Sequence, residues 1–182
     1  AGDSYGSMFG ASRNPYDLER TAGGSSGGSG AALAANFSTL ALGEETNASI
    51  RRPGAWNAVV SLRPTPGLVS RTGMWDGYPT TAAQIGPMAR TVTDLARLLD
   101  VMVGYDPEDP LTALGVNVKQ VPYTKYLDRG GLKSARIGVL RDVLGSATDP
   151  ASPEFRAVDA VFNRTVAELT SLGATVVDPI VI

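Results

Sequence analysis

Two serines in turn-forming surroundings are the strongest candidates for chemistry in this chain. Ser25 lies in the run Gly-Gly-Ser-Ser-Gly-Gly-Ser at positions 23–29, and Ser49 follows 24 positions later in Glu-Glu-Thr-Asn-Ala-Ser-Ile-Arg at positions 44–51. The glycines around Ser25 allow backbone conformations that other residues avoid, and they align successive N–H groups with little steric cover. Such a loop can hold an anion.

The composition restricts which mechanism these serines could use. The chain contains no histidine and no cysteine, which excludes the commonest catalytic triads. The nucleophile and base are then limited to Ser or Thr activated by Lys or a carboxylate. The same absences exclude disulfides and a thiolate metal site and remove the commonest metal ligand. The sequence therefore predicts neither a metal nor a cofactor.

Three other interpretations of the glycine-rich run are weaker. A flexible Gly/Ser linker is disfavoured because helix-forming residues follow at 30–36 and an apolar run follows at 38–42. A phosphate-binding loop would need a Gly-Lys-Ser/Thr after the glycines, and none is present. Residues 24–28 also fit the Gly-x-Ser-x-Gly nucleophile elbow with Ser26 as nucleophile, but that mechanism requires a histidine.

The two serine motifs together resemble the signature region of the amidase signature family. In that family the glycine-rich loop supplies a serine beside a cis peptide, the later serine before Ile-Arg is the nucleophile, and an upstream lysine completes a Ser-cisSer-Lys triad. The resemblance implies that Ser25 is the proton-relaying cis serine and that Ser49 is the nucleophile of an amidase. It also implies an oxyanion hole formed by backbone N–H groups of Thr46, Asn47 and Ala48. A non-proline cis peptide is expected in the serine loop.

The resemblance continues in family order beyond these motifs. It is close over about positions 6–110, where the similar segments are Asn57–Thr65, Gly67–Arg71, Gly86–Ala96 and Gly104–Pro110. Two positions depart from the family pattern: the usual Gly-Gly before the nucleophile is Asn47-Ala48, and the usual Thr-Asp-Thr is Glu44-Glu45-Thr46. We expect these side chains to narrow the site or to alter the turn.

The implied catalytic lysine has no counterpart upstream of Ser25, because positions 1–24 contain no lysine. The three lysines present follow the motif: Lys119, Lys125 and Lys133. Family members run to several hundred residues in one compact domain, so we interpret residues 1–182 as the central segment of a single amidase signature domain that lacks its N- and C-terminal parts. This chain alone is then expected to be inactive. The alternative is a non-catalytic fragment or binding module that keeps the fold without the lysine.

Charge and hydropathy limit the partners. The formal net charge is −2, from 18 acidic and 16 basic residues, and the basic residues are scattered, so no nucleic-acid surface is predicted. This segment has no apolar run of about 18 residues and no signal-peptide pattern, and hence no membrane signal. Localisation stays open, with a slight preference for the cytoplasm. The expected partners are a small-molecule amide substrate and the remaining segments of the same enzyme.

The hydrophobic pattern predicts an α/β fold. Expected helices are 30–36, 50–56, 91–103 and 152–172, and expected strands are 38–42, 58–62, 135–140 and 174–182. Positions 68–90 hold many turn formers. The strand, helix, strand order at the C-terminal end predicts a right-handed crossover within a mixed, largely parallel β-sheet flanked by helices. By resemblance this is the amidase signature fold, present in part.

The short helix at 50–56 is expected to direct its first N–H groups at Ser49, and the resemblance implies that Arg51 braces the turn. Two sets of apolar residues have open roles. Tyr5, Met8 and Phe9 either line a substrate pocket, as the resemblance implies, or anchor a core. Trp75 and Tyr78 either contact substrate or plug a core edge.

Overall fold

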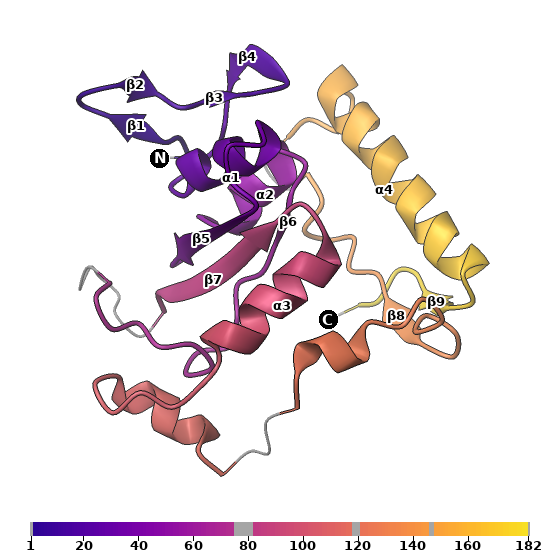
Figure 1. Cartoon of the computed structure of the whole chain (residues 1–182). Helices are drawn as coiled ribbons and strands as arrows, with labels where there is room; N and C mark the ends of the chain where they lie inside the picture. The colour runs from indigo at the N-terminus through magenta and orange to yellow at the C-terminus, as the bar shows by residue number, and fades with distance from the viewer. Residues whose placement is uncertain (1, 75–81, 118–120, 146–147, 182) are drawn as a thin grey trace. The chain divides into compact units, whose positions relative to one another are not determined.

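The computed structural model describes residues 2–74, 82–117, 121–145 and 148–181, which form two compact units, Ala1–Tyr126 and Leu127–Ile182. Figure 1 shows their helices and strands. The first unit contains β1 Tyr5–Gly6, β2 Gly10–Ala11, β3 Arg13–Asn14, β4 Asp17–Thr21, α1 Gly27–Ala34, β5 Leu40–Glu45, α2 Arg51–Trp56, β6 Val60–Ser61, β7 Gln84–Ala89, α3 Val92–Met102 and the 3-10 helices η1 Pro110–Gly115 and η2 Tyr123–Tyr126. The second unit contains β8 Arg136–Gly138, α4 Pro153–Ser171 and β9 Thr175–Val177.

Strand β7 is central to the three-stranded sheet of the first unit. It pairs antiparallel with β5, from Leu40↔Ala89 to Glu45↔Gln84, and antiparallel with β6 on its other side. The sequence pattern of positions 68–90 does not predict this strand, because Gly86 and Pro87 both disfavour strands. Pairing on both sides overrides that local preference, and the Pro87 carbonyl accepts a hydrogen bond from the Leu62 N–H at 3.1 Å.

The core of the first unit joins α1 and the turn after β5 to this sheet. Leu33, Ile50, Val59 and Met88 form a buried cluster against which Ala34 and Ala41 pack. Burial of each large apolar side chain stabilises the fold by about 1.5–3 kcal/mol. The cluster therefore anchors the chain immediately after Ser49.

Helix α3 confirms the prediction for positions 91–103. The Thr91 side chain accepts a hydrogen bond from the Asp94 N–H at 3.0 Å, which caps the helix. Its buried residues are Leu95, Ala96 and Leu99, on the face that contacts the sheet. The apolar stripe is thus core.

The second unit has the predicted strand, helix, strand order. Strands β8 and β9 pair parallel, with Arg136 opposite Thr175, and α4 lies between them in the chain. The Ser152 side chain accepts a hydrogen bond from the Phe155 N–H at 3.1 Å, which caps α4. The α/β class is confirmed. Among the described strand pairs, β8–β9 is parallel and the other four are antiparallel, so the expected largely parallel pairing is not found in the described residues. Short turns join β1 to β2 and β3 to β4, and a short connection permits only antiparallel pairing.

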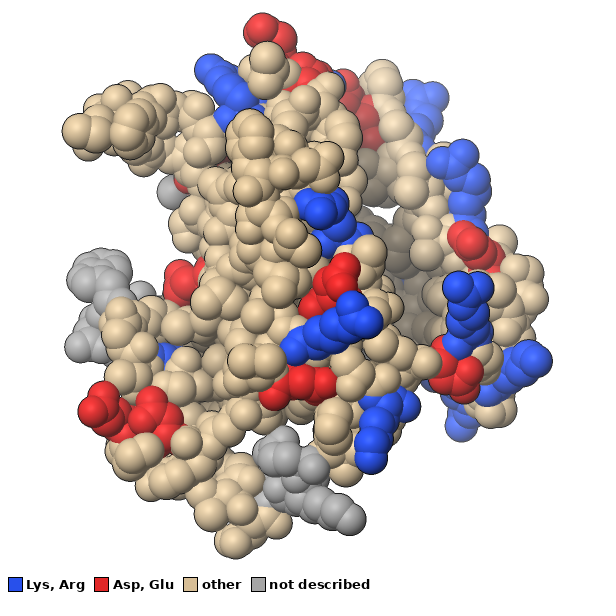
Figure 2. Space-filling model, in the orientation of Figure 1, with Lys and Arg blue, Asp and Glu red and all other residues tan. Residues whose placement is uncertain are grey.

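Two small hairpins, β1–β2 and β3–β4, begin the first unit. Tyr5, Met8 and Phe9 lie on or beside the first hairpin and are 76%, 81% and 88% exposed, so they do not anchor the core of this unit. Trp75 and Tyr78 lie outside the described residues. In Figure 2 acidic and basic side chains are interspersed over the visible face. Among the described helices, none has the length and apolar character needed to cross a membrane.

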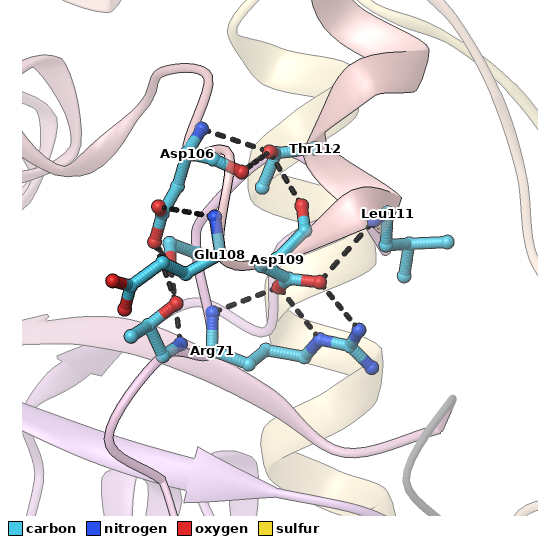
Figure 3. A network of polar contacts seen from close by, with 8 residues as sticks. Arg71, Asp106, Glu108, Asp109, Leu111 and Thr112 are labelled. Carbon is cyan, nitrogen blue, oxygen red and sulfur yellow. Dashed lines mark hydrogen bonds and ion pairs between the residues drawn. The ribbon is translucent and has the colours of Figure 1, made fainter.

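A polar network fastens the chain around Ser70 and Arg71 to the turn that begins η1 (Figure 3). Arg71 donates to Asp109 Oδ2 from its backbone N–H and from Nε, each at 2.9 Å, and to Oδ1 from Nη2 at 2.7 Å. The Ser70 hydroxyl donates to Asp106 at 2.5 Å, and the Thr112 hydroxyl donates to the Asp109 carbonyl at 2.7 Å. Asp109 is 4% exposed, so this ion pair is buried on the carboxylate side.

Candidate active site

Ser25 lies in the loop between β4 and α1 and is exposed. The peptide bond between Gly24 and Ser25 is cis, as predicted for this loop. The Ser4 hydroxyl donates to the Ser25 carbonyl and accepts from the Gly27 N–H, both at 2.8 Å. A Cβ on Gly24 would lie 2.4 Å from the Asp3 carbonyl oxygen, so only glycine fits there without movement of the backbone. The N-terminal segment thus supports the Ser25 loop from one side.

Ser49 lies in the turn between β5 and α2 and is half-buried. Glu45 at the end of β5 and Ile50 just after Ser49 are both fully buried. The two ends of the turn are therefore fixed in the interior, while residues 46–49 between them reach the surface.

Ser26 joins the two serine-bearing turns. Its N–H donates to the Ser49 carbonyl at 3.1 Å. Its hydroxyl donates to the Glu44 carbonyl at 3.2 Å and accepts from the Glu44 N–H at 3.1 Å. The structure therefore brings the two motifs into direct contact. Because the Ser26 hydroxyl is engaged with the backbone of β5, the nucleophile-elbow interpretation is disfavoured.

The turn before Ser49 presents a run of backbone N–H donors. Among the described residues, the N–H groups of Thr46, Asn47, Ala48 and Ser49 enter none of the backbone hydrogen bonds outside helices and strands. Positive φ angles occur at three described non-glycine residues, which are Asn36, Ala58 and Ser134. Asn47 and Ala48 thus occupy the places of the usual glycines without left-handed backbone. This arrangement can accept an oxyanion.

The carboxylate of Glu45 spans this turn. Its Oε2 accepts the N–H groups of Ile50 and Arg51, each at 2.9 Å, and its Oε1 accepts Nε of Arg51 at 2.7 Å. Nη2 of Arg51 forms an ion pair with the same Oε1 at 2.6 Å. Nε of Arg63 lies 3.9 Å from Oε1. Burial acts to raise the pKa of Glu45, but hydrogen bonds from the Arg51 side chain and from the Arg51 and Ile50 N–H groups together outweigh it and lower that pKa. Glu45 is therefore ionised at neutral pH.

The expectation that the first N–H groups of α2 point at Ser49 is wrong. The N–H groups of Ile50 and Arg51 bind Glu45 instead, because its buried carboxylate is the nearest strong acceptor. The prediction that Arg51 braces the turn is confirmed, since its Nη2 also donates to the Asn47 carbonyl at 2.6 Å. Sequence reasoning missed Glu45, although an acidic residue six positions before an arginine across a turn was the available signal.

Asn57 is a second residue that sequence reasoning missed. It is fully buried, and its Nδ2 donates to the Ala22 carbonyl at 2.7 Å and to the Pro53 carbonyl at 2.8 Å. Ala22 precedes the glycine-rich loop and Pro53 lies in α2, so this amide ties the supports of the two serines together.

The lysines and the acidic side chains are the remaining candidates for a base or for metal ligands. Lys125 and Lys133 are exposed, and Lys119 lies outside the described residues. Within the described ranges, no group of three or more acidic, histidine or cysteine side chains is placed to hold a metal ion.

Comparison with known proteins shows the family of this chain. The family model described as Amidase matches residues 2–181. This chain belongs to the amidase family. Among curated relatives of this amidase-family chain, the A subunit of glutamyl-tRNA(Gln) amidotransferase from Sulfurisphaera tokodaii is 45% identical over 171 residues, which are 93% of this chain and 33% of that protein. The chain thus spans about a third of the length of the curated relatives that it matches.

Solved amidase structures show the same fold. The peptide amidase from Stenotrophomonas maltophilia matches with a TM-score of 0.84 and 36% identity over 99% of this chain and 35% of that chain. The A subunit of glutamyl-tRNA(Gln) amidotransferase from Thermotoga maritima matches with a TM-score of 0.78 and 34% identity over 96% of this chain and 36% of that chain. The amidase signature fold is therefore present in part, as predicted.

Proposed function

We propose that this chain carries the nucleophile and oxyanion hole of a serine amidohydrolase that cleaves carboxylic amides through an acyl-enzyme. The observation that carries the proposal is the turn of open N–H groups beside Ser49, which the hydrogen bond from the Ser26 N–H to the Ser49 carbonyl joins to the Ser25 loop. Membership of the amidase family supports the same reaction.

In the proposed mechanism the Ser49 oxygen attacks the amide carbonyl while its proton passes to Ser25. The carbonyl oxygen becomes an oxyanion held by N–H groups of Thr46, Asn47 and Ala48, each worth about 3–4 kcal/mol where such donors have been removed. The C–N bond then breaks as Ser25 returns a proton to the leaving amine. Water attacks the Ser49 ester in the second half of the reaction and releases the carboxylic acid.

We further propose that the base is a lysine outside residues 1–182, in a remaining segment of the same enzyme. A lysine accepts a proton at neutral pH only when burial or neighbouring charges lower its pKa, and Lys125 and Lys133 are exposed. Residues 1–182 are then a central segment of one domain, which agrees with their covering about a third of the relatives. On this proposal the chain alone is inactive.

The proposed substrate class is a small-molecule carboxylic amide. The similar proteins include a peptide amidase and a 6-aminohexanoate cyclic dimer hydrolase, whose names both refer to amide-containing compounds. The shared feature is the amide carbonyl, which is the group that the open N–H donors would polarise.

The test is covalent labelling of the full-length protein with a fluorophosphonate, followed by peptide mapping. We expect an adduct on Ser49, no adduct in Ser49→Ala, and slow labelling in Ser25→Ala, because Ser25 relays the proton but does not form the bond. Residues 1–182 alone should not label. An adduct on Ser26 in Ser49→Ala would favour the nucleophile elbow, and an unlabelled full-length protein would favour a non-catalytic binding module.

A further inference from the structure

Three carbonyl groups of the nucleophile turn, which we define as residues 46–49, are each held by a specific donor. The Asn47 carbonyl accepts from Nη2 of Arg51 at 2.6 Å, and the Ala48 carbonyl accepts from the Arg52 N–H at 2.9 Å. The Ser49 carbonyl accepts from the Ser26 N–H at 3.1 Å. Three successive peptide groups are thus fixed from their carbonyl side.

Fixing a carbonyl also fixes the direction of the next N–H. In a trans peptide the C=O of one residue and the N–H of the following residue point in opposite directions. The peptides of this turn are trans, since the cis peptides of the described residues are Gly24-Ser25 and Asp178-Pro179. The Arg51 contact on the Asn47 carbonyl therefore aims the Ala48 N–H away from Arg51.

Arg51 depends on Glu45 for this placement. The side chain of Arg51 is 62% exposed, so packing alone does not hold its guanidinium over the turn, whereas that of Glu45 is fully buried at 0%. The hydrogen bond from Nε to Oε1 and the ion pair of Nη2 with the same oxygen hold the guanidinium beside the buried carboxylate. Meanwhile Oε2 binds the N–H groups of Ile50 and Arg51 and turns those donors inward.

We infer that Glu45 is a positioning residue for the oxyanion hole, which acts through Arg51 to aim the N–H group of Ala48 at the reacting carbonyl oxygen. This inference rests on the proposed function and assigns a task to a residue that does not itself touch substrate. It also explains the chemistry required at position 45. Four donor groups converge on two oxygens, so a side chain with two acceptors and no donor is needed.

Three variants of the full-length protein test the inference. Glu45→Gln keeps the shape but must turn an NH₂ group toward one of the two donor pairs. Glu45→Asp keeps both acceptors on a shorter stem. Arg51→Lys keeps the charge, but its single ammonium cannot reproduce the planar contact that joins Glu45 to the Asn47 carbonyl. Asp109→Asn is the matched control, because it also changes a buried carboxylate paired with an arginine, in a network built from other residues.

The readout is the fluorophosphonate labelling of Ser49, resolved into the limiting rate kinact and the half-saturation constant KI and expressed per folded protein. We expect kinact to fall about 100-fold in Glu45→Gln and at least about 10-fold in Arg51→Lys, because a misdirected oxyanion donor acts on the transition state. KI should change less than about threefold, Glu45→Asp should be intermediate, and Asp109→Asn should keep kinact within about twofold.

The outcomes separate this inference from the proposed function. Wild-type protein that does not label at Ser49 would refute the proposed function and, with it, the role of Glu45. Wild-type labelling with kinact unchanged in folded Arg51→Lys, or in folded Glu45→Gln, would refute the positioning role alone. A loss in Asp109→Asn as large as that in Glu45→Gln would show that general destabilisation, and not the aim of the Ala48 N–H, controls the rate.

Discussion

Replacing Asp109 by asparagine is expected to destabilise the protein by an amount that depends on pH. Hydrogen bonds from the Arg71 side chain have the largest effect on the pKa of Asp109, which they lower. Burial acts to raise this pKa, and hydrogen bonds from the Arg71 and Leu111 N–H groups lower it further. Together they lower the pKa of Asp109 from its ordinary 3.8 to about 2. Ionised Asp109 is therefore favoured in the folded state relative to the unfolded chain.

The size of the effect follows from this difference in pKa. A fall from 3.8 to about 2 corresponds to about 2.5 kcal/mol of stability at neutral pH. Because the folded pKa is the lower one, this stability is present above the unfolded pKa and is lost as pH falls through the folded pKa. At pH 3, between the two values, about half of it remains. The asparagine variant lacks the titrating group and therefore lacks this dependence.

Urea unfolding of the full-length protein, followed by circular dichroism, measures the prediction. At pH 7 the free energy of unfolding of the wild type should exceed that of Asp109→Asn by about 3 kcal/mol, because the substitution breaks an ion pair whose carboxylate is buried. At pH 3 the gap should shrink by about 1 kcal/mol. A gap below about 0.5 kcal/mol at pH 7, or the same gap at both pH values, would show that the network in Figure 3 does not stabilise the fold as its geometry indicates.

Two further substitutions test the elements that support the site. Thr91→Ala should lower the free energy of unfolding by about 1 kcal/mol, because it removes the cap on the Asp94 N–H; an unchanged urea midpoint would contradict the capping role. Gly86 lies in the central strand β7, and Gly86→Ala should destabilise the protein by about 1–3 kcal/mol, because the new Cβ would lie 2.0 Å from the Leu62 carbonyl oxygen. Gly28→Ala, whose Cβ would meet nothing within 4 Å, is the control for the thermal melt, and equal melting of the two variants would refute the close approach at Gly86.

The sequence by itself determined the features that depend on near neighbours in the chain. The α3 cap at Thr91 and the α4 cap at Ser152 were predictable because a capping side chain bonds an N–H three residues away. The two serine motifs and the family could likewise be identified from residue types and spacing, and the absence of histidine disfavoured the nucleophile elbow on composition alone.

Only the tertiary structure decided how the turn before Ser49 is supported. The pattern of positions 68–90 does not predict β7, because a strand containing Gly86 and Pro87 forms only when partners pair with it on both sides. The role of Glu45 was hidden for a related reason. A glutamate at the end of a strand is ordinarily solvated, and burial becomes favourable only where several donors converge on its carboxylate. Those donors come from the far side of the turn and meet Glu45 only after the chain has folded back on itself.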